Sequence, residues 1–190
     1  MSAEPIEPEE EVAEPEVAEP EVAEHAPGGL EVPDGVAVLE GEPAGGRPVA
    51  VVVARFNGEY TARMLARALE ELEAHGVPEG LVTVVPVPGA FELPLGAMAV
   101  AKTRRYACVV ALGCVIRGET PHFDYIAGEA ASGLQLAALE TGVPVSFGLL
   151  TVETAVQAEA RIDKAAEAVR TALEMADLFA EIRAGAAQSA

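Results

Sequence analysis

The sequence predicts an α/β fold in which helices cover both faces of a parallel β-sheet. Two observations support this fold class. Short continuous runs of apolar and β-branched residues are typical of strands that are buried on both faces. Each run is followed by a segment with apolar residues at helical spacing, and the alternation occurs four times in series. The expected architecture is therefore a three-layer α/β/α sandwich around a four-stranded parallel sheet.

The first strand-helix unit follows Gly46. Residues 48–54, PVAVVVA, form a β-branched run that predicts a buried strand. Asn57 suits the N-cap of the next helix, and Gly76 with Pro78 predicts its end. The apolar stripe between these signals consists of Tyr60, Met64, Leu65, Ala68, Leu69 and Leu72.

The remaining units follow the same order. Strands are predicted at residues 81–87, 107–112 and 145–150, with helices near 91–103 and 122–140 and helical segments from residue 153 onward. The weaker apolar segment Val36 to Leu39 is expected to add an N-terminal strand, either at an edge of this sheet or to the sheet of a neighbouring subunit.

Residues 1–35 differ in composition from the rest of the chain. They contain EVAEPEVAEPEVAE, a five-residue repeat of Glu, Pro, Val and Ala that offers too little apolar surface to offset the entropy of ordering. We therefore predict a disordered acidic tail at 1–35 and a folded domain at 36–190. The tail is either solubilising without a specific partner or a docking segment.

The charge is divided unevenly between these two parts. Fourteen of the 31 acidic residues precede Arg47, the first basic residue, so residues 47–190 carry seventeen acidic and twelve basic side chains. A net charge of about −5 without a basic cluster gives binding to nucleic acid or to an acidic membrane surface little electrostatic support.

Neither a transmembrane helix nor a signal peptide is predicted, because the chain has no long uncharged apolar run and no basic start before a hydrophobic segment. The expected location is the cytoplasm. Cys108 and Cys114 lie in one predicted strand, which would hold them about 20 Å apart, too far to pair. We expect both to be buried free thiols. No histidine lies at ligand spacing from them, so they do not indicate a metal site.

Three unusual loops follow the first three predicted strands. Phe56 follows the first, Pro88 to Glu92 the second, and Gly113 to His122 the third. Ligands of open parallel sheets bind beyond the carboxyl ends of the strands, where such loops converge. The three loops therefore predict a binding cleft.

The third loop has features of an anion site. Thr120 followed by Pro121 suits an N-cap and a first helical proline, which would leave backbone N–H groups and the positive end of a helix dipole facing the loop, next to the flexible Gly118. An ordinary helix start is the alternative. His122 in the first turn could exchange protons with a ligand near neutral pH or could be a surface histidine without a role.

The residues of the other two loops are also open to two interpretations. Phe56 and Phe91 are either core residues or rings that face a planar ligand in the cleft. Glu92 either binds a ligand or is favoured by the helix dipole alone. The chain has no GxxxxGK[ST], GxGxxG, GxSxG or HExxH motif, so none of the corresponding phosphate-binding loops and catalytic sites is predicted.

Four segments together resemble the lumazine synthase family. They are RFN at 55–57, PGAFELP at 88–94, GCVIRGETPHFDYI at 113–126 and ALEMADLF at 172–179, in the order and at spacings compatible with the family. The resemblance extends from about residue 36 to residue 182. It implies a flavodoxin-like subunit that assembles into pentamers, in some members into a hollow icosahedral shell of twelve pentamers.

The resemblance also implies the reaction. Members of the family condense 5-amino-6-ribitylaminouracil with 3,4-dihydroxy-2-butanone 4-phosphate to 6,7-dimethyl-8-ribityllumazine, phosphate and water, in riboflavin biosynthesis and without a cofactor or metal. The expected partners are these small-molecule substrates and further copies of the chain, with riboflavin synthase as an additional candidate. Alternatives are a flavin- or lumazine-binding shell protein without turnover and a monomeric carrier of flavin mononucleotide.

By the same resemblance, each site residue has an expected role. Phe56 would stack on the uracil ring, and His122 would donate and accept protons. Glu119 and Thr120 would hold the keto-phosphate. The pyrimidine substrate and its ribityl chain would contact Ala90, Phe91, Glu92, Cys114, Val115 and Ile116.

Phe147 and Arg161 match further family site positions, the latter for phosphate binding, but Phe147 lies in the middle of a predicted strand, away from the cleft. The family builds each site between neighbouring subunits, so both residues are expected to serve the cleft of an adjacent copy. A guanidinium suits this role because it pairs bidentately with phosphate. The family's loop after this arginine is shortened here, and Lys164 is the candidate for its phosphate-side lysine.

Overall fold

The computed structural model describes residues 30–188, and the chain divides into two units, Met1–Val36 and Ala37–Ala190. The described part of the first unit contains a turn at Asp34 and Gly35, where the Val36 N–H donates to the Pro33 carbonyl at 3.2 Å. The predicted tail at 1–35 lies almost entirely outside the described residues.

The second unit is built on a four-stranded parallel sheet with strand order β2-β1-β3-β4. The strands are β1 (Val49–Ala54), β2 (Val82–Val87), β3 (Cys108–Ile116) and β4 (Val145–Val152). The predicted flavodoxin-like sheet is confirmed. All six residues of β1 are buried, as expected for a strand between two others with helices on both faces.

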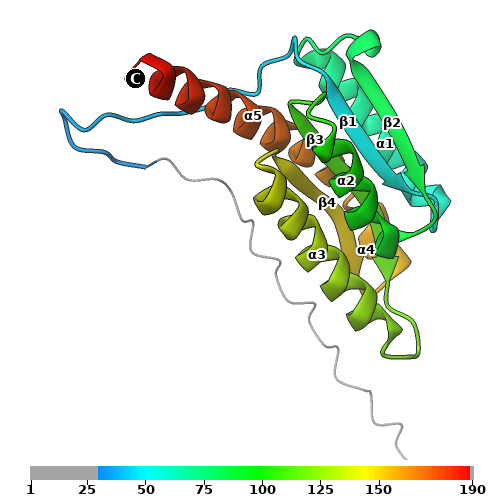
Figure 1. The fold of residues 1–190 in the computed structure, drawn as a ribbon. Coiled ribbons are helices and arrows are strands. Elements are labelled where there is room, and N and C mark those ends of the chain that lie inside the picture. Colours follow the sequence, from blue (N-terminus) through cyan, green and yellow to red (C-terminus); the bar gives the residue numbers. More distant parts are fainter. Residues whose placement is uncertain (1–29, 189–190) are drawn as a thin grey trace, which may run out of the picture. The chain divides into compact units, whose positions relative to one another are not determined.

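Helices connect the strands and cover both faces of the sheet (Figure 1). Their bounds are α1 (Gly58–Ala74), α2 (Leu93–Lys102), α3 (His122–Thr141), α4 (Ala155–Glu159) and α5 (Lys164–Gln188), with short 3₁₀ turns at η1 (Glu79–Leu81) and η2 (Ala90–Glu92).

The alternation of side chains along the central strands creates two core layers. Val51 of β1 packs with the helices α1, α4 and α5 on one face, whereas Val52 packs with α2 and α3 on the other. Gly113 of β3 allows close packing of the second layer, since a Cβ atom there would lie 2.7 Å from Leu149 Cδ1 and 3.0 Å from Leu93 Cδ1. This glycine lies inside the strand, so β3 continues four residues beyond the predicted end at residue 112.

Residues 37–39 form no strand in the sheet of this chain, so that alternative for the added N-terminal strand was wrong. Polar contacts fix the segment that follows them to α5 instead. The backbone N–H of Glu42 donates to Asp177 at 3.2 Å, and Arg47 pairs with the same carboxylate at 2.6 Å. Val38 and Leu39 remain exposed, and pairing with a neighbouring subunit stays a prediction.

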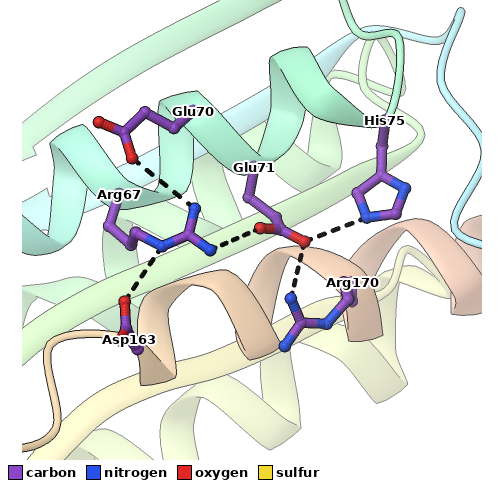
Figure 2. A network of polar contacts seen from close by, with 6 residues as sticks. All are labelled: Arg67, Glu70, Glu71, His75, Asp163 and Arg170. Atoms are coloured by element: carbon purple, nitrogen blue, oxygen red, sulfur yellow. Dashed lines mark hydrogen bonds and ion pairs between the residues drawn. The ribbon is translucent and has the colours of Figure 1, made fainter.

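The buried carboxylate of Glu71 in α1 forms an ion pair with α5 (Figure 2). Glu71 is 8% exposed and accepts hydrogen bonds from Arg67 at 2.9 Å and from Arg170 of α5 at 2.7 Å, while the His75 ring lies 3.1 Å away. Burial alone would raise the pKa of Glu71, but the hydrogen bonds from Arg170, Arg67 and His75 outweigh it and hold the pKa below its ordinary value.

Candidate functional site

A cavity of about 500 Å³ lies beyond the carboxyl ends of β1, β2 and β3, where the sequence predicted a cleft. Residues from all three loops line it. Nine of the predicted site residues are among them, namely Phe56, Ala90, Phe91, Glu92, Cys114, Val115, Ile116, Thr120 and His122.

The loops after β1 and β2 are held side by side by backbone hydrogen bonds. The N–H of Arg55 donates to the Val87 carbonyl at 2.8 Å and that of Phe56 to the Pro88 carbonyl at 3.1 Å, so the pairing of the strands continues past their ends. The rings of Phe56 and Phe91 are 70% and 54% exposed. Neither is a core residue, and both offer apolar surface at the cavity.

Asn57 precedes α1, as predicted, but its side chain does not cap the helix. Its backbone is in the left-handed region at φ 56°, which asparagine tolerates better than most residues. The side-chain Nδ2 donates to the Cys114 carbonyl at 2.9 Å. Asn57 therefore ties the first loop to the end of β3, and it lines the cavity.

The start of α3 differs slightly from the prediction. The helix begins at His122, Pro121 already has helical dihedral angles at φ −62° and ψ −1°, and no side chain caps the end. The prediction that Thr120 acts as a capping side chain was therefore wrong, because the proline itself begins the helical path. Among the first N–H groups of α3, that of Asp124 donates to the Pro121 carbonyl at 3.0 Å. Those of His122 and Phe123 have no acceptor within the helix, and both residues line the cavity together with Thr120.

The two cysteines are buried and unpaired, as predicted. Burial raises the pKa of Cys114, which lines the cavity, to about 11 and that of Cys108 to about 12. Both thiols are therefore protonated at neutral pH, and Cys114 contributes an apolar wall rather than a nucleophile.

Four predicted site residues do not line this cavity. Glu119 is exposed in the loop between two lining residues, Gly118 and Thr120. Phe147 pairs in register with Ala111 in the middle of β3, is 50% exposed and lines a different cavity of about 370 Å³ against α3.

The other two lie at the α4–α5 connection. Arg161 Nη1 donates to the Gln157 carbonyl at 3.1 Å. Lys164 pairs with Glu167 at 2.8 Å. The structure thus does not bring Phe147, Arg161 or Lys164 to the cavity of their own chain.

Sequence reasoning missed five lining residues as site residues, although it had noted two of them for other reasons. Asn57 was predicted only as a helix cap and Gly118 only as a flexible position. Gly89 allows close approach, since a Cβ atom there would lie 3.2 Å from Glu92 Oε2. Phe123 and Ile126 follow His122 on α3, and helical spacing from His122 would have placed Ile126 on the same face.

This fold and cavity define a class of protein, the parallel α/β sandwich with a ligand site at the carboxyl edge of its sheet. Within that class, residues 46–180 match the family model described as 6,7-dimethyl-8-ribityllumazine synthase. The chain belongs to this family, which assigns it to riboflavin biosynthesis as a transferase. None of the helices described between residues 30 and 188 has an apolar stretch that could span a lipid bilayer.

Proposed function

We propose that the protein condenses 5-amino-6-ribitylaminouracil with 3,4-dihydroxy-2-butanone 4-phosphate, releasing 6,7-dimethyl-8-ribityllumazine, phosphate and water. One observation carries the proposal. Two exposed aromatic rings, a carboxylate, a helix N-terminus and a histidine line the same cavity of about 500 Å³. The aromatic rings and the carboxylate suit the pyrimidine, and the helix N-terminus suits the keto-phosphate. The histidine suits the proton transfers of the condensation.

The pyrimidine occupies the part of the cavity formed by the loops after β1 and β2. Phe56 stacks on the uracil ring, because an exposed ring gains contact area and electrostatic complementarity from a planar partner. Ala90 and Phe91 contact the substrate, and the carboxylate of Glu92 accepts hydrogen bonds from its donor groups. The end of β3, from Cys114 to Ile116, supplies the apolar wall.

The keto-phosphate occupies the part of the cavity next to the N-terminus of α3. Unpaired backbone N–H groups and the helix dipole stabilise an anion there. Thr120 adds a hydroxyl donor, and Glu119 lies beside it in the same loop. Gly118 leaves room for a ligand to approach the backbone, since no atom lies within 4 Å of the position a Cβ would take.

His122 transfers the protons that the reaction requires. Condensation of an amine with a ketone moves protons from nitrogen to the departing oxygen, and the loss of phosphate requires a proton acceptor for the adjacent carbon. An imidazole suits both directions because one ring nitrogen can donate a proton while the other accepts one. Its place in the first turn of α3 puts it next to the proposed phosphate position.

A neighbouring copy completes the site. Phe147 and Arg161 lie away from the cavity of their own chain, yet both match family site positions, and Phe147 exposes half of its ring. We assign them to the cavity of an adjacent subunit, where Phe147 covers the pyrimidine and Arg161 binds the phosphate, with Lys164 as a second cation. Activity therefore requires an oligomer, either a pentamer or a shell of pentamers.

The test is to mix both substrates with the purified protein and to follow the lumazine chromophore together with phosphate release. The proposal predicts that both appear at the same rate and require both substrates. Lumazine binding without turnover would instead support a shell protein that only binds its ligand. A stable monomer that binds flavin mononucleotide would support the carrier alternative.

A further inference from the structure

Arg117 lies between the end of β3 and Gly118, and its guanidinium makes several contacts at once. Two of its nitrogens donate to the two carboxylate oxygens of Asp124, at 2.9 and 3.2 Å. Its Nε pairs with Glu153, at 3.0 Å to one oxygen and 2.7 Å to the other. The guanidinium carbon lies 4.1 Å from the centre of the Phe123 ring, a cation–π contact.

We infer that Arg117 is a positioning residue of the reaction, which holds His122, Phe123 and the proposed phosphate-binding loop in their working arrangement. The inference rests on the proposed function. Arg117 itself does not line the cavity, and its effect is transmitted through the residues that it contacts.

Besides the Arg117 side chain, backbone hydrogen bonds hold the two ends of this loop: the Arg117 N–H donates to the Val152 carbonyl at 2.9 Å and the Asp124 N–H to the Pro121 carbonyl at 3.0 Å. Residues 117–121 are all exposed, so packing contributes little to their order. The Asp124 carboxylate is part of the first turn of α3, two residues after His122. A bidentate pair between Arg117 and Asp124 therefore joins the two ends of the loop, and the planar fork of an arginine defines the geometry in a way that a single ammonium does not.

The contact with Phe123 extends the effect to the cavity wall. Phe123 lines the cavity next to His122, and the guanidinium over its ring restricts where that ring can lie. The hydrogen bonds from Arg117 lower the pKa of Asp124, which is consistent with an ionised partner throughout the neutral range.

Glu153 connects the same guanidinium to the segment that carries Arg161. The N–H of Glu153 donates to the Gln157 side-chain oxygen at 2.9 Å, and the Gln157 backbone carbonyl accepts from Arg161 at 3.1 Å. Arg117 is thus linked both to the groups that serve the cavity of its own chain and to the arginine that we assign to the next one.

A positioning role of Arg117 can be distinguished from a purely stabilising one by comparing its effect on the turnover rate with its effect on folding stability. The Arg117 side chain is 36% exposed and its two carboxylate partners are more exposed still, and exposed ion pairs contribute little to folding. Misplacement of a reacting group, in contrast, can cost roughly 100-fold in rate. Loss of Arg117 should therefore reduce turnover far more than stability.

The experiment compares the variants Arg117→Met, Arg117→Lys, Asp124→Asn and the double variant Arg117→Met/Asp124→Asn. Arg47→Met is the matched control, since Arg47 is 38% exposed, also pairs with a carboxylate, and lies at the amino end of the sheet. Steady-state kinetics with each substrate varied, thermal unfolding and the size of the assembly are measured for every variant.

We expect Arg117→Met to lower kcat by roughly 10- to 100-fold with little change in the KM for the pyrimidine, because the side-chain contacts of Arg117 are with Asp124, Glu153 and Phe123 and not with the loops after β1 and β2. Arg117→Lys should recover part of the rate. Asp124→Asn should reproduce much of the loss, and the double variant should be no slower than Arg117→Met, because both changes remove one clamp. Arg47→Met should turn over like the parent.

Two results would overturn the inference while leaving the proposed function intact. One is an Arg117→Met protein that turns over at the parent rate. The other is a double variant whose loss is the product of the two single losses, which would show that the residues act independently. A parent protein that makes no lumazine from the two substrates would instead reject the proposed function and this inference with it.

Discussion

The two histidines of the described residues occupy different environments, and the roles that we propose for them follow from this difference. His75 lies 3.1 Å from the buried Glu71 carboxylate at the end of α1, whereas His122 is exposed at the cavity. The first environment suits a structural contact. The second allows proton exchange with a ligand, as proposed.

His122→Ala should slow the condensation by roughly 100-fold or more, the typical effect of losing a general acid-base group. Assembly should be unaffected, because the side chain is exposed and has no described protein partner. Initial rates of chromophore formation, with sizing of the same sample, measure both. A variant as fast as the parent would remove His122 from any proton-transfer role.

At this scale the sequence predicted much of the cavity and misjudged a few residues for physical reasons. Loop residues that follow parallel strands meet at one edge of the sheet, so the sequence alone predicted that Phe56, Phe91 and His122 lie close together. The role of Asn57 was not predictable, because its bond to Cys114 joins residues far apart in sequence. In the proposed site, the positions of Phe147 and Arg161 would depend on a second chain, which the sequence of one chain does not place.

At the scale of elements, the periodicity of apolar residues predicted which segments are strands and which are helices. It did not predict where every element ends. The sequence suggested that a strand ends before Gly113, but this residue lies within β3. A glycine is required there because Leu93 and Leu149 pack closely against it. The glycine serves packing rather than a turn. Local sequence cannot distinguish these two uses, since the packing partners come from α2 and β4.

Glu71→Gln should weaken the attachment of α1 to α5. The carboxylate accepts charged hydrogen bonds from two arginines, and replacing it should lower the free energy of unfolding by about 1–3 kcal/mol near neutral pH. Chemical unfolding at equal protomer concentration measures this, because the proposed assembly would also contribute to stability. An unchanged unfolding midpoint and slope would contradict the structural role.

The same pair of proteins should differ in pH dependence. The folded-state pKa of Glu71 is lowered, so its contribution is complete above the ordinary glutamate pKa of about 4.3 and is lost as pH falls through the lower folded value. The stability difference between parent and Glu71→Gln should therefore shrink on acidification below about pH 4. If the stability difference between the two proteins grew on acidification, the pKa of Glu71 would be raised by folding and not lowered.

At the scale of the whole molecule, the acidic N-terminal segment contains none of the residues that we assign to the proposed chemistry. We propose that residues 1–35 form a tail without a role in turnover. Their composition provides too little apolar surface for a fold of their own. Deleting them should leave the rate of condensation and the size of the assembly unchanged, and a large loss of rate in an assembled deletion variant would contradict this.

The exposed apolar surface of α3 and β4 also concerns the whole molecule. Leu139 and Phe147 are 73% and 50% exposed and line one cavity of about 370 Å³. Apolar surface concentrated in this way favours burial against another molecule. A neighbouring copy is the expected occupant, since the same burial would bring Phe147 to an adjacent site.

The most direct test of a site shared between chains is to co-assemble two defective variants. Arg161→Ala should lose about 1.5–3 kcal/mol of phosphate binding, or roughly 10- to 150-fold, mainly as weaker saturation by the keto-phosphate. The His122→Ala variant lacks the proton-transfer group. In a mixed oligomer, some junctions receive Arg161 from one chain and His122 from the other.

We predict that such mixtures turn over faster than either variant alone. The control replaces the Arg161→Ala partner with an Arg161→Ala/His122→Ala double variant, in which no junction has a histidine and no rate should return. Mixtures that never exceed both single variants, although subunit exchange is demonstrated, would contradict the account by showing that Arg161 and His122 do not meet across a subunit boundary.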